Sequence, residues 1–120
     1  MQQATTPAAY FEAEDGWHGE TVVPLPSLEN RFLWVHTHGQ YPDLRWGNNL
    51  VVTRASVMQA ANGGFVTKWF EDFNQVVLQT QHECVNEKLV RQQHERALTM
   101  LDDIVRNATA FYLPQAAKAA

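Results

Sequence analysis

The stretch RFLWVHTH, Arg31 to His38, decides the fold of this 120-residue chain. Its residue types alternate with a period of two, the period at which side chains of a β-strand take opposite faces of a sheet. One face carries Phe32, Trp34, His36 and His38. The other face carries Arg31, Leu33, Val35 and Thr37. The stretch therefore predicts a strand with one aromatic and imidazole face and one mainly aliphatic face.

Turn-forming residues separate this strand from further strand-like stretches. Residues 39–49 are rich in Gly, Pro, Asp and Asn and predict a loop. Residues 50–59 are rich in β-branched side chains, and the following Asn62-Gly63-Gly64 is a strong hairpin signal. Residues 65–70 are the expected partner strand. The sequence thus predicts an antiparallel meander of three strands over residues 31–70, and residues 71–79 fit either a fourth strand or an early helix start.

A long C-terminal helix is expected over about residues 81–112. Thr80 and Glu83 fit a capping box, in which each side chain accepts a hydrogen bond from a backbone amide of the first turn. Apolar residues recur at helical spacing as far as Pro114, where the helix should end. Such a helix is roughly 48 Å long, which exceeds the width of a domain of this size. Either it kinks or its end meets a second subunit, and we expect a homodimer.

Charge is unevenly distributed along the chain. Residues 1–30 contain five acidic residues and no Lys or Arg, although the whole chain has a net charge of only -4. We expect a flexible N-terminus over residues 1–9 and an acidic arm with short extended pieces at the start of a single domain, residues 10–113. Residues 114–120 are expected to form a flexible tail. The arm suits a basic partner, and the overall negative charge disfavours indiscriminate duplex binding.

Composition excludes several classes of protein. The hydrophobic fraction of 45% is that of an ordinary globular domain. No stretch approaches the roughly 20 apolar residues that span a bilayer, and the first residues lack the basic start and apolar run of a signal peptide. Cys84 is the single cysteine and cannot form an internal disulfide. We therefore expect a cytoplasmic protein in which Cys84 is a small core residue.

His36 and His38 are the strongest candidates for metal ligands, because alternate residues of a strand face the same way about 7 Å apart. A site also needs a third and a fourth ligand. The remaining candidates are His18, His82, Cys84 and His94, none at a recognisable metal-binding spacing. A Cys84 nucleophile fails because a helix would separate it from both His82 and His94. We therefore predict no metal, no cofactor and no enzymatic activity.

The aromatic face is the predicted binding surface. Its residues are Phe32, Trp34, His36, His38, Arg54 and Trp69. The opposite face offers the helix Leu33, Val35, Val51, Ala55, Val57, Val66 and Phe70. The aromatic face suits three kinds of cover: the acidic arm or a second subunit, a protein partner, or a single-stranded nucleic acid. Trp and Arg are enriched at protein hot spots and also stack on unpaired bases.

The predicted order of elements, an antiparallel sheet followed by one long helix, resembles that of PC4-like single-strand-binding proteins. The resemblance lies in element order and matches no motif residue, so it transfers no functional residue. It implies a single-stranded nucleic-acid-binding protein as one alternative, and a His-based metal-dependent enzyme is the second. Our leading hypothesis is an α+β domain that acts as a small non-enzymatic interaction or regulatory protein. An inhibitor or accessory factor from a prokaryotic mobile element fits this description.

Overall fold

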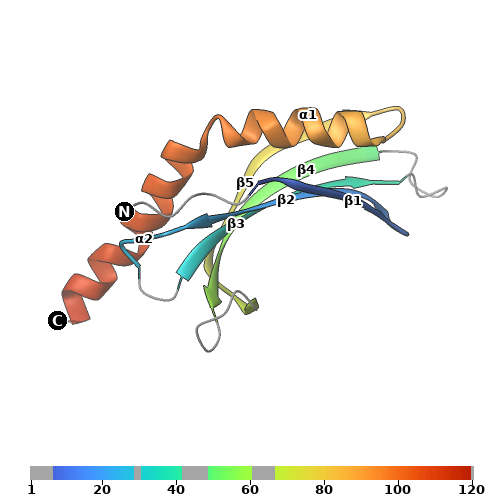
Figure 1. Cartoon of the computed structure of the whole chain (residues 1–120). Helices are drawn as coiled ribbons and strands as arrows, with labels where there is room; N and C mark the ends of the chain where they lie inside the picture. The colour runs from blue at the N-terminus through green and yellow to red at the C-terminus, as the bar shows by residue number, and fades with distance from the viewer. Residues whose placement is uncertain (1–6, 29–30, 42–48, 61–66, 120) are drawn as a thin grey trace.

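The protein is an α+β domain built on one antiparallel sheet, and its computed structural model describes residues 7–28, 31–41, 49–60 and 67–119. The sheet is a meander in chain order, formed by β1 (Ala9–Ala13), β2 (Gly16–Pro24), β3 (Arg31–Gln40), β4 (Asn49–Ala60) and β5 (Thr67–His82). It is followed by α1 (Glu87–Leu98) and α2 (Leu101–Ala119). Both helices lie on the same side of the sheet (Figure 1). The α+β class is confirmed, whereas the predictions of three or four strands and of one long helix are not.

The N-terminal region belongs to the sheet and is not a separate arm. Strand β2 pairs with β3 along its whole length, from Gly16 opposite Gln40 to Pro24 opposite Phe32, and β1 adds the edge strand. The tight β1–β2 turn depends on Gly16, whose φ of 146° is rarely adopted by residues with a side chain. A Cβ at Gly16 would lie 1.9 Å from the carbonyl oxygen of Gly39. The acidic residues of this region are therefore held on a rigid hairpin.

Residues 71–79 are strand, because β5 continues to His82. The predicted capping box at Thr80 is therefore wrong, since Thr80 is a strand residue whose hydroxyl bonds to a side chain of α1. The helix begins after Asn86, whose side-chain oxygen accepts a hydrogen bond from the backbone N–H of Leu89 at 3.0 Å. Asn is a better cap than Thr, and Asn86 fills this role six residues after the predicted cap, Thr80.

The long helix kinks, which was one of the two ways to accommodate its length. Between α1 and α2, the Thr99 hydroxyl donates to the carbonyl of Arg96 at 2.6 Å, and the Met100 N–H donates to the carbonyl of Ala97 at 3.0 Å. These local bonds replace two continuing helical bonds and turn the chain. The predicted end at Pro114 is also wrong, because α2 continues through it to Ala119. A proline removes one helical hydrogen bond and bends the helix without having to end it.

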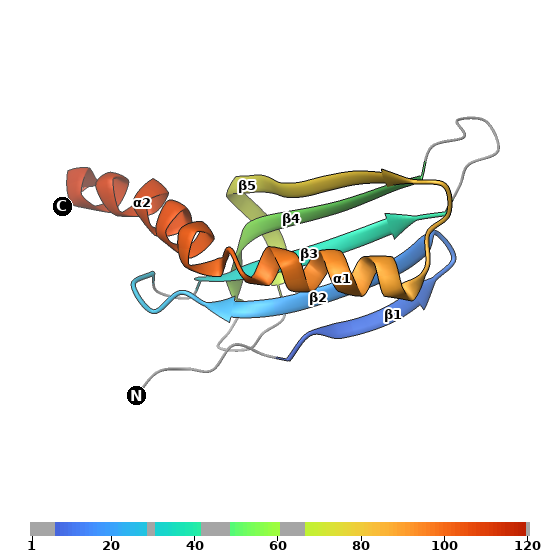
Figure 2. The same cartoon turned by 90° about the horizontal axis from the view of Figure 1, so that it is seen from above.

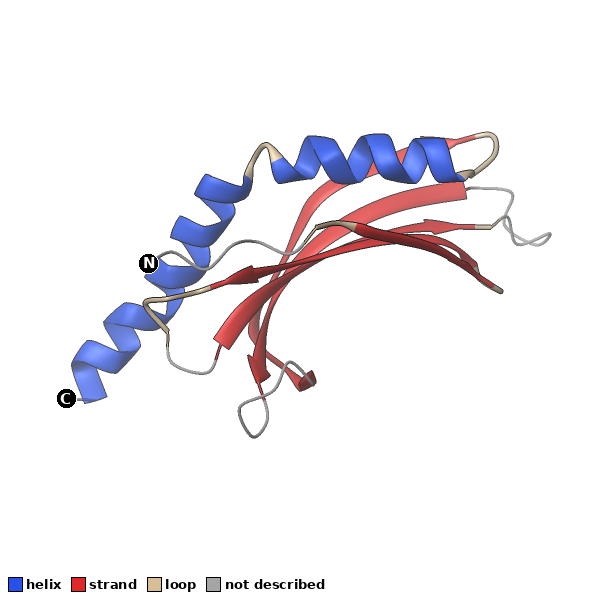
Figure 3. Cartoon of the chain, in the orientation of Figure 1, coloured by secondary structure: helices blue, strands red, loops and turns tan. Residues whose placement is uncertain are grey.

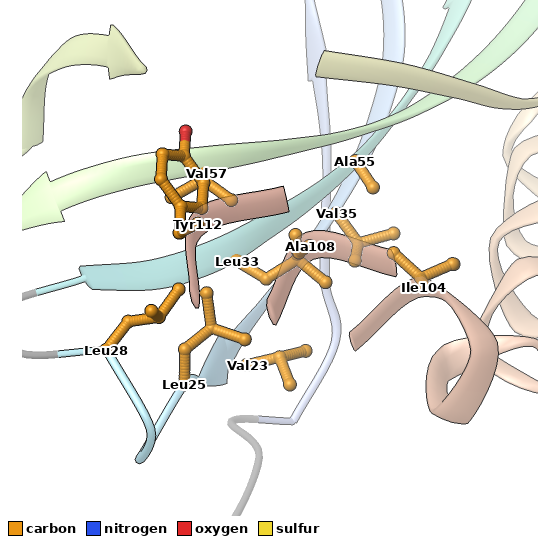
Figure 4. Packing of buried hydrophobic residues seen from close by; sticks show 10 residues of the cluster. All are labelled: Val23, Leu25, Leu28, Leu33, Val35, Ala55, Val57, Ile104, Ala108 and Tyr112. Atoms are coloured by element: carbon orange, nitrogen blue, oxygen red, sulfur yellow. The ribbon is translucent and has the colours of Figure 1, made fainter. Parts of the chain in front are cut away.

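The helices cover the aliphatic face of the sheet, as the alternation in β3 predicts. Leu33, Val35 and Thr37 have no exposed surface, and they pack under the helices. Figure 4 shows Ile104, Ala108 and Tyr112 of α2 directed at side chains of the sheet and of the β2–β3 connection. Burial of each such side chain contributes about 1.5–3 kcal/mol. The complete cluster is Val23, Leu25, Leu28, Leu33, Val35, Ala55, Val57, Ile104, Ala108 and Tyr112.

A second, smaller cluster lies at the other end of the strands. Val51 of β4 packs there with Val85 and Val90, and Tyr10 and Trp17 border it. The backbone of Gly39 lies directly below α1, since a Cβ at this position would come within 2.5 Å of Val90 Cγ2. The absence of a side chain at Gly39 thus allows this end of α1 to pack directly on the backbone of β3.

Polar side chains, all but one of them buried, separate the two clusters. We call them the threonine seam, which comprises Thr21, Thr37, Thr53, Thr80, Gln93 and His94. His94 has no exposed surface, and its ring nitrogens lie 2.8 Å from the hydroxyls of Thr21 and Thr37. The Thr37 hydroxyl lies 2.6 Å from that of Thr53. A continuous hydrogen-bonded chain therefore runs from β2 to β5 beneath α1, as buried polar groups require.

The side chain of Gln93 anchors one end of this hydrogen-bonded chain, and His94 forms the other. The amide nitrogen of Gln93 donates to the carbonyl of Val51 at 2.8 Å and to the Thr53 hydroxyl at 3.3 Å. The hydroxyls of Thr53 and Thr37 continue the chain to Nδ1 of His94. A neutral His94 that carries its proton on Nε2 donates to Thr21 and accepts from Thr37.

The hairpin ends of β4 and β5 turn toward the side of the sheet opposite α1 (Figures 1 and 2). The β4–β5 register shifts near Thr53, Ser56 and Met58, which allows this bend. The predicted turn at Asn62-Gly63-Gly64 lies outside the described residues. In the described part of the chain, neither helix has the length and apolar composition of a membrane-spanning segment.

Candidate functional site

The sheet face opposite the helices carries a group of rings, here called the ring face. Its members are Phe11, His18, Trp34, His36 and His38. The register brings them together, because His18 pairs with Phe11 on β1 and with His38 on β3. His36 pairs with Glu20 on β2 and with Arg54 on β4. Figure 3 shows that the β1–β2 turn lies at the opposite end of the sheet from the bent β4–β5 hairpin.

The rings of this face stack on one another in two directions. Across the strands, the ring centroids of Phe11 and His18 lie 5.0 Å apart, and those of His18 and His38 lie 4.3 Å apart. Along β3, Trp34 stacks on His36 at 4.6 Å, and their planes differ by 11°. Each such pair adds about 0.5–1.5 kcal/mol beyond area burial. The result is a continuous stack of rings over three strands.

Asp15, in the β1–β2 turn, places a carboxylate at the end of this stack. Its Oδ1 accepts a hydrogen bond from Nε2 of His18 at 2.9 Å. Its Oδ2 lies 3.3 Å from Nε2 of His38, which is ion-pair distance, but this nitrogen is buried and makes no well-aligned hydrogen bond. On the far side of the His18 ring, Nδ1 lies 2.9 Å from Nε2 of His36.

Burial favours the neutral forms of His36 and His38. Burial, with a smaller effect of the neighbouring imidazoles, lowers the pKa of His36 to about 4. Burial, followed by His18, also lowers the pKa of His38. The hydrogen bond from His18 lowers the pKa of the exposed Asp15 carboxyl. At neutral pH the site therefore has an ionised carboxylate facing two imidazole rings.

Carboxylates outnumber cations on the described ring face. Glu20 accepts a hydrogen bond from the indole N–H of Trp34 at 3.2 Å, which fixes the indole plane against the sheet. Arg54 is exposed on this face. Among the described side chains, it is the basic residue that the face carries. The described ring face thus carries two carboxyl side chains, Asp15 and Glu20, against one guanidinium group.

The structure brings together four of the six predicted binding residues. Trp34, His36 and His38 are half-buried neighbours, and Arg54 lies opposite His36. Phe32 belongs to the same face but is buried at its far end, opposite Met58. Trp69 lies in β5, and its side chain is outside the described part of the chain.

The other candidate ligands are not part of the ring face. His94 is buried on the helix side of the sheet, and His82 bonds to Thr80. Cys84 is exposed, so the prediction that it is a small core residue is wrong. The residue lies in the turn between β5 and α1. One group of side chains among the described residues is arranged so that it could hold a metal ion. Its members are Asp15, His18 and His38.

Sequence reasoning missed Phe11, Asp15 and Glu20 and placed His18 only as a candidate without a position. Cross-strand pairs depend on register, which a single strand does not reveal. One local signal was available, because Asp15-Gly16 is a hairpin dipeptide. That hairpin, aligned with β3, would have placed His18 beside the histidine pair.

No protein-family model, curated protein or solved structure was found to match this chain. Function must therefore be argued from the chemistry of the site. The resemblance to PC4-like proteins remains one of element order.

Proposed function

We propose that this chain is a non-enzymatic binding protein that takes a basic protein segment on the ring face. The observation that carries the proposal is the combination of stacked rings and carboxylates on the sheet face that neither helix covers. The opposite face has its cover in α1 and α2, whose contacts account for its apolar side chains. A cover for the ring face has to come from elsewhere.

Charge favours a basic partner. The β1–β2 hairpin contains Glu12, Glu14, Asp15 and Glu20 and no Lys or Arg. The carboxylates of Asp15 and Glu20 lie at the edges of the ring stack. A phosphate backbone on this face would be repelled by these two carboxylates, and Arg54 is the described cation that could offset the repulsion. Single-stranded nucleic acid therefore fits this face poorly.

The rings suit guanidinium groups in particular. Arginine stacks on aromatic planes and donates several hydrogen bonds in one plane, so it can lie on Trp34 and reach Glu20 at the same time. Within the molecule, Arg91 already lies over the ring of Tyr10 at 4.1 Å in such a contact. Trp34, His36 and Glu20 would therefore provide the centre of the contact.

A labelled arginine-rich peptide tests the proposal by fluorescence anisotropy, with a glutamate-rich peptide of the same length and oligo-dT as competing probes. We expect binding of the arginine peptide that weakens as salt is added. Glu20→Gln retains the acceptor for Trp34 and removes the charge, so it should weaken binding about two- to fivefold. The matched control is Glu95→Gln, which removes an exposed acid from α1 on the other side of the sheet.

Two results would contradict the proposal. Equal losses in Glu20→Gln and Glu95→Gln would show that only the overall charge matters. Tighter binding of oligo-dT than of the peptide would instead support the nucleic-acid alternative.

A further inference from the structure

We propose that Asp15, His18 and His38 form a binding site for one divalent transition-metal ion of the zinc class. The site joins the β1–β2 turn to β2 and β3, and it goes beyond the binding of a protein segment. One donor atom from each residue lies within 4.8 Å of the other two. The three residues are 23 positions apart at most, yet only the hairpin register brings them together.

The distances fit a metal with small adjustments. Zinc binds imidazole nitrogen and carboxylate oxygen at about 2.0–2.2 Å, which puts the donors of a tetrahedral site roughly 3.3 Å apart. His18 Nε2 lies 2.9 Å from Asp15 Oδ1, and His38 Nε2 lies 3.3 Å from Asp15 Oδ2. The carboxylate therefore already stands between the two nitrogens.

His38 provides an independent indication. Its Nε2 is buried and lies 3.3 Å from Asp15 Oδ2 without a well-aligned hydrogen bond to that carboxylate, and the Asp15 backbone also acts on this ring. A buried nitrogen without a partner is a costly arrangement. A metal ion between His38 and Asp15 would give this nitrogen the partner that its geometry lacks.

The donor set selects the class of ion. Two imidazoles and one carboxylate suit Zn²⁺ and its neighbours in the first transition row, whereas Ca²⁺ and Mg²⁺ prefer sites made of oxygen donors. The described residues supply no thiolate here, because Cys84 belongs to the turn before α1.

His36 acts as a positioning residue for this site. Its Nε2 lies 2.9 Å from Nδ1 of His18, on the side of the ring that faces away from Asp15. When the ion replaces the proton on His18 Nε2, the neutral ring carries its proton on Nδ1 and donates it to His36. Partners of this kind orient ligating histidines. They typically raise the affinity for the metal about 10- to 100-fold.

Three protein donors leave at least one coordination position for water or for a donor from a bound molecule. The site is accessible, since the Asp15 side chain is 59% exposed and that of His38 is 29% exposed. Asp15 and Glu20 place two carboxyl side chains on the described ring face, and a divalent cation would offset their charge. The ion would thereby change which partners the face attracts.

The experiment is a titration of the intact chain with Zn²⁺ alone, followed by calorimetry and by imidazole ¹⁵N spectra. We expect one ion per chain, with the resonances of His18 and His38 shifted and those of His82 and His94 unchanged. Asp15→Asn and His38→Ala should each lower the affinity about tenfold or more. His82→Ala is the matched control and should bind as the unaltered chain does.

The spectra on the unaltered chain keep the test decisive even if a variant folds poorly. Shifts confined to His82, or an affinity that neither Asp15→Asn nor His38→Ala reduces, would overturn the site. Co²⁺ in place of Zn²⁺ supplies a second readout, because its visible absorption reports ligand number and geometry. Loss of the metal site would leave peptide binding to Glu20 and Trp34 intact, so the two proposals fail separately.

Discussion

The hydroxyl of Thr37 lies 2.8 Å from Nδ1 of His94, which joins β3 to α1 at the centre of the sheet. The same hydroxyl lies 2.6 Å from that of Thr53, so Thr37 also links His94 to β4. The neighbour of Thr37 in sequence, His36, points to the ring face and stacks on Trp34. One strand thus separates a sealed polar network from an accessible set of rings.

Thr37→Val tests the seam, because valine keeps the shape of threonine and removes the hydroxyl. The change leaves Nδ1 of buried His94 without its Thr37 partner, which should lower the free energy of unfolding by about 1–3 kcal/mol. Urea unfolding followed by circular dichroism measures the difference. Thr109→Val on α2, outside the seam, is the control and should change stability by less than about 0.5 kcal/mol. Equal effects of the two changes would contradict the role of the seam.

His94 should make the fold sensitive to acid. Burial lowers its pKa from 6.5 to about 4, so the unfolded chain binds the proton more readily than the folded one. Stability from this group is therefore complete above pH 6.5 and is lost as the pH falls toward 4, by about 3 kcal/mol in total. The titratable or charged groups around the helix side of this ring are Tyr10, Arg91 and Glu95, and His36 lies across the sheet.

The measurement is urea unfolding at several pH values for the unaltered chain and for His94→Gln. Other histidines titrate in both proteins, so the difference between the two isolates His94. We expect the stability advantage of the unaltered chain to shrink as the pH falls from 7 to 4. An advantage that stays constant over this range would be inconsistent with a buried neutral His94.

Gly39→Ala should weaken the attachment of α1. The new Cβ would lie 2.5 Å from Val90 Cγ2 and 2.6 Å from Val85 Cγ1, so the helix must move outward. Overpacking of this kind costs about 1–3 kcal/mol. Hydrogen exchange should accelerate in α1 more than in β2 and β3. Gln40→Ala, at the exposed neighbouring position, should leave exchange unchanged.

Zinc should weaken binding of the basic segment, since the ion would add positive charge beside Trp34 and Glu20. One equivalent of Zn²⁺ should weaken binding of the arginine-rich peptide by about threefold, and a chelator should restore it. Asp15→Asn should remove this dependence on zinc. If zinc instead tightened binding of the peptide in the unaltered chain, the placement of the ion beside the peptide-binding surface would be wrong.

The sequence predicted what local periodicity controls. The alternation of Leu33 with Trp34 assigned both faces of β3 correctly, because a strand repeats every two residues whatever its neighbours are. Residues 10–24 gave weak strand signals, since their glycines and acids are poor strand formers, and pairing with β3 overrides that preference. Thr80 matched a cap pattern, but its hydroxyl has a better-buried partner in Gln93.

The candidate site was harder to predict than the fold. His36 and His38 were found because they share one strand, whereas Asp15 and His18 join them only through the register of the β1–β2 hairpin. The seam was missed for the same reason, since its four threonines come from four different strands. The homodimer remains a prediction, and the kink between α1 and α2 removes the helix length on which it rested.

The central claim is that the ring face is the surface through which this chain binds. The most direct test is a side-chain NMR spectrum of the labelled chain, recorded with and without the arginine-rich peptide. Two pairs of probes distinguish the faces: the indole N–H of Trp34 against that of Trp17, and the imidazole of His36 against that of His94. We predict that Trp34 and His36 shift while Trp17 and His94 do not. Shifts of Trp17 and His94 with Trp34 and His36 unchanged would contradict the account.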